Sequence, residues 1–136
     1  MKSIYFPLSI ASRLLGDAQA SPDVEICGII AIDGKHNFYC YPVDNISITP
    51  NINFEMDPKQ LIHCQKTLRD KNQSMVAIYH SHPNGNTQPS TTDIEQHEYY
   101  DLLYLIITPG SEGVMSLSGF SINEDTSVHP VILRTV

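Results

Sequence analysis

The residues His80, His82 and Asp93 form the sequence pattern in this 136-residue chain with the clearest chemical meaning. His80 and His82 are two residues apart, and Asp93 follows eleven residues after His82. In a strand, residues two apart point to the same side, so both imidazoles can reach one ion. A bare pair of this kind is more often two solvated histidines, but Asp93 adds a third ligand of the right type. Two histidines and a carboxylate suffice for a catalytic zinc site whose fourth position stays open for water, and this predicts a hydrolase.

Two further residues fit the remaining chemistry of such a site. Ser90 precedes Asp93 by three residues, so it suits either a helix cap or a hydroxyl that donates to an oxyanion. Glu25 stands before the apolar run at 26–30, where a carboxylate is costly to bury without a partner. It suits either a general base beside the metal or the last exposed residue of the preceding loop. The local sequence leaves both choices open.

The elements that must position these residues alternate between strand and helix patterns. We expect strands over 4–6, 24–32, 37–43, 75–79, 102–108, 115–122 and 128–136. Helices are expected from Pro7 to about residue 20, from Pro58 onward with Asp57 as the cap, and from Ser90 onward. Hairpin-like connections follow the second strand, at 33–34, and lie near residue 113. The pattern predicts an α/β sandwich around a mixed sheet flanked by helices.

Bulk composition narrows the class of protein. We expect one domain over residues 1–136, and 41% hydrophobic with 17% charged residues argues against disorder. A net charge of −7 disfavours nucleic-acid binding. Cys27, Cys40 and Cys64 form no C-x-x-C pair, which favours a reducing compartment. With no signal-peptide pattern in residues 1–7 and no apolar run long enough for a membrane span, a cytoplasmic location is expected. The oligomeric state stays open.

Taken together, the motifs resemble the signature of the JAMM (MPN+) zinc metallopeptidases, in the small prokaryotic JAB-domain branch. The signature elements are a glutamate, then H-S-H-P at 80–83, a six-residue gap, and S-x-x-D at 90–93. The segment Glu25-x-Cys27-Gly28 also resembles the first-strand motif of that branch. Asn45, Phe54 and Asp57-Pro58 are similar to its middle segment. One departure is Thr87, at a loop position where alanine is common, and it leaves the ligand set intact.

This resemblance implies a cytidine-deaminase-like fold with one zinc ion (Zn2+) per chain. It implies His80, His82 and Asp93 as metal ligands, Glu25 as the base, and Ser90 as a group that stabilises the tetrahedral intermediate. The implied reaction is hydrolysis of the peptide or isopeptide bond after the C-terminal Gly-Gly of a ubiquitin-like protein. In bacterial relatives the partner is a ubiquitin-like sulfur carrier.

Three alternatives within the resemblance stay open. A phage tail-assembly type of JAB peptidase carries a second domain, which we do not expect here. A DNA-repair-associated relative shares the loop spacing, including Gly85 and Pro89, but the acidic charge and the segment at 25–28 favour the peptidase. A non-catalytic MPN scaffold would not require a complete ligand set.

Residues outside the motif receive structural interpretations. His36, His63, His97 and His129 lack ligand spacing and are expected to be surface or satisfied polar residues. Cys27 is expected to behave as a small buried hydrophobe. Tyr99, Tyr100 and Tyr104 are expected to pack rather than to recognise a partner.

Overall fold

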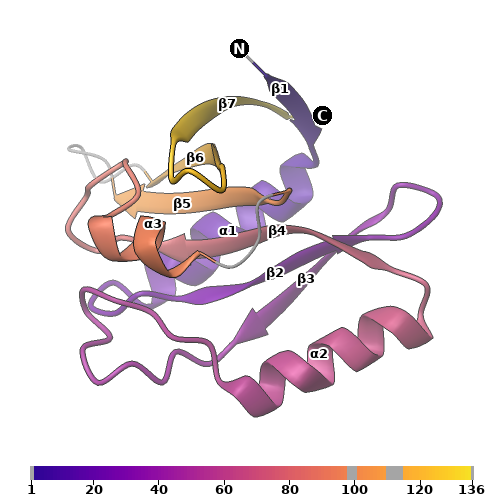
Figure 1. Cartoon of the computed structure of the whole chain (residues 1–136), viewed down its shortest axis with the longest axis horizontal. Helices are drawn as coiled ribbons and strands as arrows, with labels where there is room; N and C mark the ends of the chain where they lie inside the picture. Colours follow the sequence, from indigo (N-terminus) through magenta and orange to yellow (C-terminus); the bar gives the residue numbers. More distant parts are fainter. Residues whose placement is uncertain (1, 98–100, 110–114, 136) are drawn as a thin grey trace.

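The chain folds into one mixed β-sheet with helices on both sides (Figure 1). The computed structural model describes residues 2–97, 101–109 and 115–135. Its strands are β1 (Ser3–Phe6), β2 (Cys27–Ile32), β3 (Phe38–Val43), β4 (Ser74–Ser81), β5 (Leu103–Pro109), β6 (Met115–Ile122) and β7 (Val128–Thr135). Its helices are α1 (Leu8–Ala20), α2 (Pro58–Asp70) and α3 (Thr91–Gln96). The expected α/β architecture is confirmed.

The sheet has the strand order β1-β7-β6-β5-β4-β2-β3. Strands β4 and β5 pair in parallel, as do β1 and β7, whereas the remaining neighbours are antiparallel. The expected hairpin between β2 and β3 is confirmed. β5 and β6 also pair as antiparallel neighbours, although most of the turn expected at 109–113 lies outside the described residues.

The three central strands β2, β4 and β5 are buried along most of their length. A strand that is covered on both faces has a nearly continuous run of apolar residues, because side chains on both sides are buried. This explains the sequences CGIIAI in β2 and LYLIITP in β5. Gly28 leaves room for the ring of Tyr79, its partner on β4, since a Cβ there would lie 2.4 Å from the Tyr79 hydroxyl oxygen. This pairing sets Cys27 beside His80.

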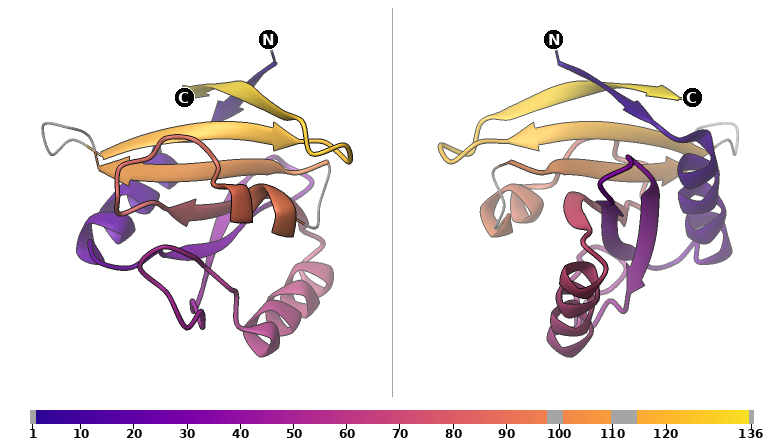
Figure 2. Two further views of the ribbon diagram at one scale, coloured as in Figure 1. Left: turned by 60° about the vertical axis from the view of Figure 1, so that its left-hand side comes forward. Right: turned by 90° about the vertical axis from the view of Figure 1, so that its right-hand side faces the viewer.

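The helices divide between the two faces of the sheet (Figure 2). Helix α1 covers one face with Ile10, Ala11, Leu14 and Ala18. Helices α2 and α3 lie on the opposite side, together with the segment that connects β3 to α2. No helix among the described residues is long and apolar enough to cross a membrane.

Two strand boundaries differ from expectation in ways that affect the site. Strand β2 begins at Cys27 rather than at Val24, because the N–H of Glu25 donates to the Pro50 carbonyl oxygen instead of to a neighbouring strand. Strand β4 extends to Ser81, so His80 lies within the strand and only His82 follows it. Glu25 is therefore held by a loop, and the histidines by the centre of the sheet.

Candidate metal centre

His80 and His82 are delivered by the buried end of β4. His80 is paired with Cys27 on one side and Ile106 on the other, and the N–H of His82 donates to the Ile107 carbonyl oxygen. The two residues are only 2% and 3% exposed. Their side chains point the same way, as alternate residues of a strand do, and their Nε2 atoms lie 3.0 Å apart.

Asp93 reaches both histidines from the first turn of α3. Its Oδ2 lies 3.0 Å from the Nε2 of His80 and 3.0 Å from the Nε2 of His82. The same oxygen accepts the N–H of Ser90, and the Ser90 hydroxyl accepts the N–H of Asp93. This reciprocal capping box starts the helix. The spacing S-x-x-D thus fixes a helix end and a carboxylate position with one motif.

Protons satisfy this triangle of atoms only when His82 carries a positive charge. Asn86 presents a carbonyl oxygen 2.8 Å from the Nδ1 of His82, so Nδ1 carries the proton and neutral His82 turns a lone pair toward the site. That lone pair faces the Asp93 carboxylate and the Nε2 of His80, each at 3.0 Å. If both Nε2 atoms were protonated instead, His82 would carry a positive charge, and its contacts with Asp93 and Asn86 raise its pKa against the effect of burial. A shared cation removes the conflict, so the three residues fit a metal ion.

The distances also suit such an ion. Tetrahedral zinc with ligands about 2.0–2.1 Å from the metal separates those ligands by about 3.4 Å. The observed separations of 3.0 Å require only a small expansion. Burial lowers the pKa of His80 against the opposing effect of Asp93. Contacts with His80, His82 and the Ser90 N–H outweigh burial and lower the pKa of Asp93 below its ordinary range. A neutral imidazole and an ionised carboxylate are the forms that bind metals.

The two histidines are supported differently. The ring of His82 is oriented by the Asn86 carbonyl group, the usual backbone partner of a metal-binding histidine. The ring of His80 stacks on Phe54, with ring centroids 4.4 Å apart and planes 23° apart. Its buried Nδ1 has no hydrogen-bond partner among the residues that the structure describes. Aromatic packing therefore holds His80 in place.

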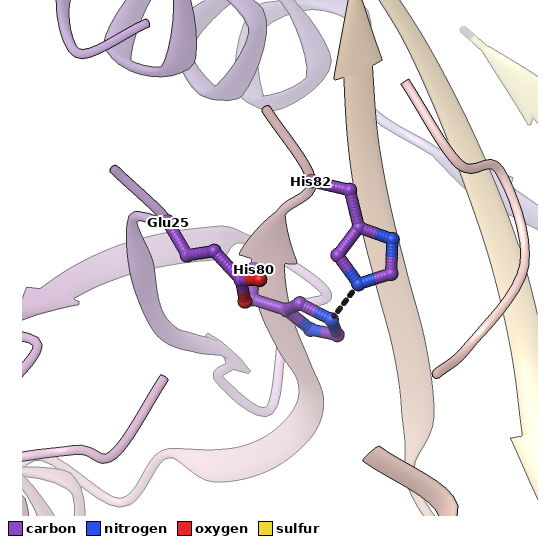
Figure 3. Close-up of side chains that lie close together, drawn as sticks. All are labelled: Glu25, His80 and His82. Carbon is purple, nitrogen blue, oxygen red and sulfur yellow. Dashed lines mark hydrogen bonds between the residues drawn. The ribbon is translucent and has the colours of Figure 1, made fainter. Parts of the chain in front are cut away.

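Glu25 faces the histidines from the segment before β2 (Figure 3). One ligand atom from each of Glu25, His80 and His82 lies within 4.8 Å of the other two. The carboxyl group is 3% exposed, and its Oε1 has no hydrogen-bond partner among the described residues. Burial raises the pKa of Glu25 to about 7; His82 opposes that shift and Asp93 adds to it. Of the two carboxylates, Asp93 approaches the histidines more closely.

A cavity of about 750 Å³ adjoins the centre on the side of α2 and α3. Its wall includes His80 and Asp93, and most of the remainder is apolar, with Phe54, Met56 and Ile78 among the lining residues. The segment between β3 and α2 contributes Ser47 and Asn53 to this wall. A substrate chain that reaches the centre can therefore occupy space next to it.

The structure brings all five sequence-predicted residues together and leaves most other histidines away from them. His36 occupies the turn between β2 and β3, and His63 lies on the exposed side of α2. His97 lines the cavity and contacts the Ile94 carbonyl oxygen. Cys27 is buried, with its pKa raised to about 12 mainly by burial. Tyr104 is buried as expected, whereas Tyr99 and Tyr100 lie outside the described residues.

Sequence reasoning missed the supporting roles of Phe54, Asn86 and Asn45. Phe54 belongs to the middle segment of the family motif. Its position against His80 depends on a contact between residues 26 positions apart in the sequence. Asn86 acts through its backbone carbonyl group, which no side-chain pattern reveals. The only available signal was an aromatic residue and an asparagine within a polar, turn-rich loop.

Comparison with known proteins identifies the family of this chain. The chain is 31% identical over 103 residues to the desampylase of Haloferax volcanii, covering 74% of each chain. It is 34% identical over 92 residues to a Thermus thermophilus protein named "Probable TtuB-protein conjugate cleaving protease", covering 68% of this chain and 58% of that one. The solution structure of a Desulfitobacterium hafniense protein superposes with a TM-score of 0.78 at 26% identity, covering 97% and 93% of the two chains. Residues 7–118 match the model of the prokaryotic homologs of the JAB domain, and the chain belongs to that family.

Proposed function

We propose that the protein is a zinc-dependent peptidase or isopeptidase that cleaves after the C-terminal Gly-Gly of a ubiquitin-like sulfur-carrier protein. The observation that carries the proposal is the convergence of three atoms. The Nε2 atoms of His80 and His82 and the Oδ2 of Asp93 lie 3.0 Å from one another. The carboxylate of Glu25, whose Oε1 has no hydrogen-bond partner among the described residues, faces the same two histidines.

In this proposal His80, His82 and Asp93 hold one zinc ion per chain. Zinc supplies Lewis acidity and makes a water molecule acidic enough to react near neutral pH. His80 lies within β4, His82 follows it directly with its N–H bonded to the Ile107 carbonyl oxygen, and Asp93 lies in the capped first turn of α3. The ligand geometry therefore depends on rigid elements rather than on loops.

Glu25 is the proposed general base. It takes a proton from the attacking water and later returns that proton to the leaving amine. Without a metal ion, burial raises the pKa of Glu25 to about 7, so its surroundings favour uptake of a proton, as a general base requires. Its Oε1 has no competing hydrogen bond among the described residues.

Ser90 is proposed to assist at the developing oxyanion. Its oxygen accepts the N–H of Asp93, and a hydroxyl that accepts one bond still has a proton to donate. Donation to the oxygen of the substrate carbonyl would stabilise the charge that develops there. Ser90 then serves as a helix cap and as a hydrogen-bond donor at once.

The substrate class is supported by the relatives and by the architecture. One relative bears the name desampylase, and the name of another specifies cleavage of a protein conjugate. An extended, slim Gly-Gly tail suits a buried centre reached from one side, and its backbone can pair with neighbouring backbone groups. The loops at 44–53 and 84–89 are proposed to line the approach.

The first test measures metal and cleavage together. Protein purified without chelator is expected to contain one zinc per chain by elemental analysis, and His80→Ala is expected to lose it. Zinc-loaded protein is then incubated with a panel of small ubiquitin-fold proteins, each extended beyond Gly-Gly, and the products are weighed by mass spectrometry. Cleavage after Gly-Gly supports the proposal. Zinc binding without cleavage of any panel member would refute the proposed substrate class. A folded protein that does not bind zinc would favour a scaffold role.

A further inference from the structure

The half-buried side chain of Asn45 connects the loop between β3 and α2 to the backbone of Glu25. Its Nδ2 donates to the Glu25 carbonyl oxygen at 2.9 Å and to the Asn53 carbonyl oxygen at 3.0 Å. Its Oδ1 accepts the N–H groups of Ser47 and Glu55, both at 3.0 Å. The two ends of the amide are not interchangeable, because one faces two carbonyl groups and the other faces two N–H groups.

Glu25 needs such support because it lies outside the sheet. Strand β2 starts two residues later, so no strand pairing holds the Glu25 backbone. Its N–H donates to the Pro50 carbonyl oxygen at 2.7 Å, and its C=O accepts from Asn45. Both partners belong to the segment 45–55. Asn45 connects the two ends of this segment through its hydrogen bonds to residues 47, 53 and 55.

The next residue is held from the other side. The N–H of Ile26 donates to the Ser81 hydroxyl at 2.8 Å, and the Ser81 N–H donates to the Ile26 carbonyl oxygen at 3.0 Å. Ser81 lies between the two histidines in sequence. The backbone that carries Glu25 is thus fixed at one point to the histidine strand and at another to the Asn45 loop.

Resting on the proposed function, we infer that Asn45 is a positioning residue for the general base Glu25. It acts through the backbone of Glu25, and nothing places it in contact with the histidines. Losing it frees the Glu25 carbonyl group and loosens the segment whose Pro50 holds the Glu25 N–H. The carboxylate then loses its fixed approach to the centre. His82 keeps its contact with the Asn86 carbonyl group, and Asp93 keeps the Ser90 N–H. Phe54, which stacks on His80, lies between the Asn53 and Glu55 backbone groups that Asn45 bonds, so activity is compared per bound zinc.

Asn45→Ala and Asn45→Asp test this inference together. The alanine variant removes all four hydrogen bonds. The aspartate variant keeps the acceptor for Ser47 and Glu55, which preserves half of the loop closure if the alanine variant folds poorly, and it sets an oxygen against the Glu25 and Asn53 carbonyl oxygens in place of the donor. The matched control is Asp33→Ala at the opposite end of β2, where Asp33 similarly accepts bonds from Lys35, Asn37 and Tyr39.

The first readout is hydrogen exchange, which needs no substrate. Both Asn45 variants are expected to speed exchange of the Glu25 amide by at least about tenfold, as losing several supporting hydrogen bonds would. Asp33→Ala should instead affect the turn at 33–37 and leave Glu25 unchanged. Unchanged exchange at Glu25 in both Asn45 variants would overturn the inference, whether or not any substrate is found.

The second readout is steady-state kinetics on a substrate that the wild type cleaves. Both Asn45 variants should lower kcat per bound zinc by about 10- to 100-fold, the usual loss when a supporting partner is removed, with KM nearly unchanged. Added to Glu25→Gln, Asn45→Ala should cause little further loss, because the two changes remove one function. A full additional loss in the double variant, or an equal loss of kcat in Asp33→Ala, would contradict the inference. If the wild type cleaves nothing, only the proposed function fails, and exchange at Glu25 still decides the role of Asn45.

Discussion

The two faces of the sheet are built for different purposes. Under α1, one continuous cluster of apolar side chains runs from Phe6 through Leu14 and Tyr79 to Leu105. Under α2 and α3 the apolar residues form two separate clusters, and the cavity of about 750 Å³ lies beside His80. Close packing of the first face contributes stability, whereas the second face keeps buried polar groups and open space. Stability and chemistry are thus assigned to opposite sides of the same strands.

The largest expected effect is a loss of catalysis without loss of fold, caused by a substitution on the face of the sheet that carries α2, α3 and the cavity. Glu25→Gln keeps the size of the side chain but removes the base, so turnover should fall by about 10²–10⁴-fold. Zinc content and the unfolding temperature should show no decrease. Full turnover of the variant on any wild-type substrate would contradict the assigned role.

Ser90→Ala tests whether Ser90 both caps α3 and donates a hydrogen bond during catalysis. Loss of an oxyanion donor should reduce turnover by about 10²–10³-fold. Loss of the cap should cost only about 1 kcal/mol of stability. Parallel measurements of turnover, zinc content and thermal unfolding separate the two effects. If activity declines only in proportion to zinc or folded protein, Ser90 is a cap alone.

Leu14→Ala changes the face of the sheet that α1 covers, and it is expected to lower stability rather than catalysis. Leu14 is fully buried in α1, and removing a buried leucine side chain costs about 2–5 kcal/mol of unfolding free energy. Denaturant unfolding measures the loss, and activity per folded molecule should stay unchanged. A selective loss of turnover with intact stability would show that the faces are not independent.

A smaller effect concerns the cost of burying Glu25. Because burial raises its folded pKa to about 7, the unfolded chain releases the proton first as pH rises. The stability that Glu25 contributes is therefore present below its unfolded pKa and is lost as pH rises through about 7. With zinc chelated, Glu25→Gln should be more stable than wild type at pH 8 by up to about 3 kcal/mol, and the difference should shrink toward pH 5. Equal stability of both proteins at both pH values would contradict this cost.

The sequence allowed prediction of the site where local geometry and side-chain type coincide. Alternation along β4 placed His80 and His82 on one side, and the S-x-x-D spacing placed Asp93 in a capped first turn. The start of β2 was wrong by three residues, because a carbonyl group of the distant residue Pro50 takes the N–H that a strand partner would need. The contacts of Phe54 and Asn45 depend on tertiary packing, which periodicity does not encode.

The capping box of α3 has a consequence for metal affinity. Helix α3 has six residues and none of them is buried, and a helix this short is marginal without outside support. Where Asp93 binds the metal as proposed, the oxygen that receives the ion is also the oxygen that accepts the Ser90 N–H. Metal binding and helix formation are then thermodynamically linked, so part of the binding free energy is spent on ordering α3. Substitutions that raise the intrinsic helicity of α3 should tighten metal binding without touching any ligand, and metal uptake should appear as added helix.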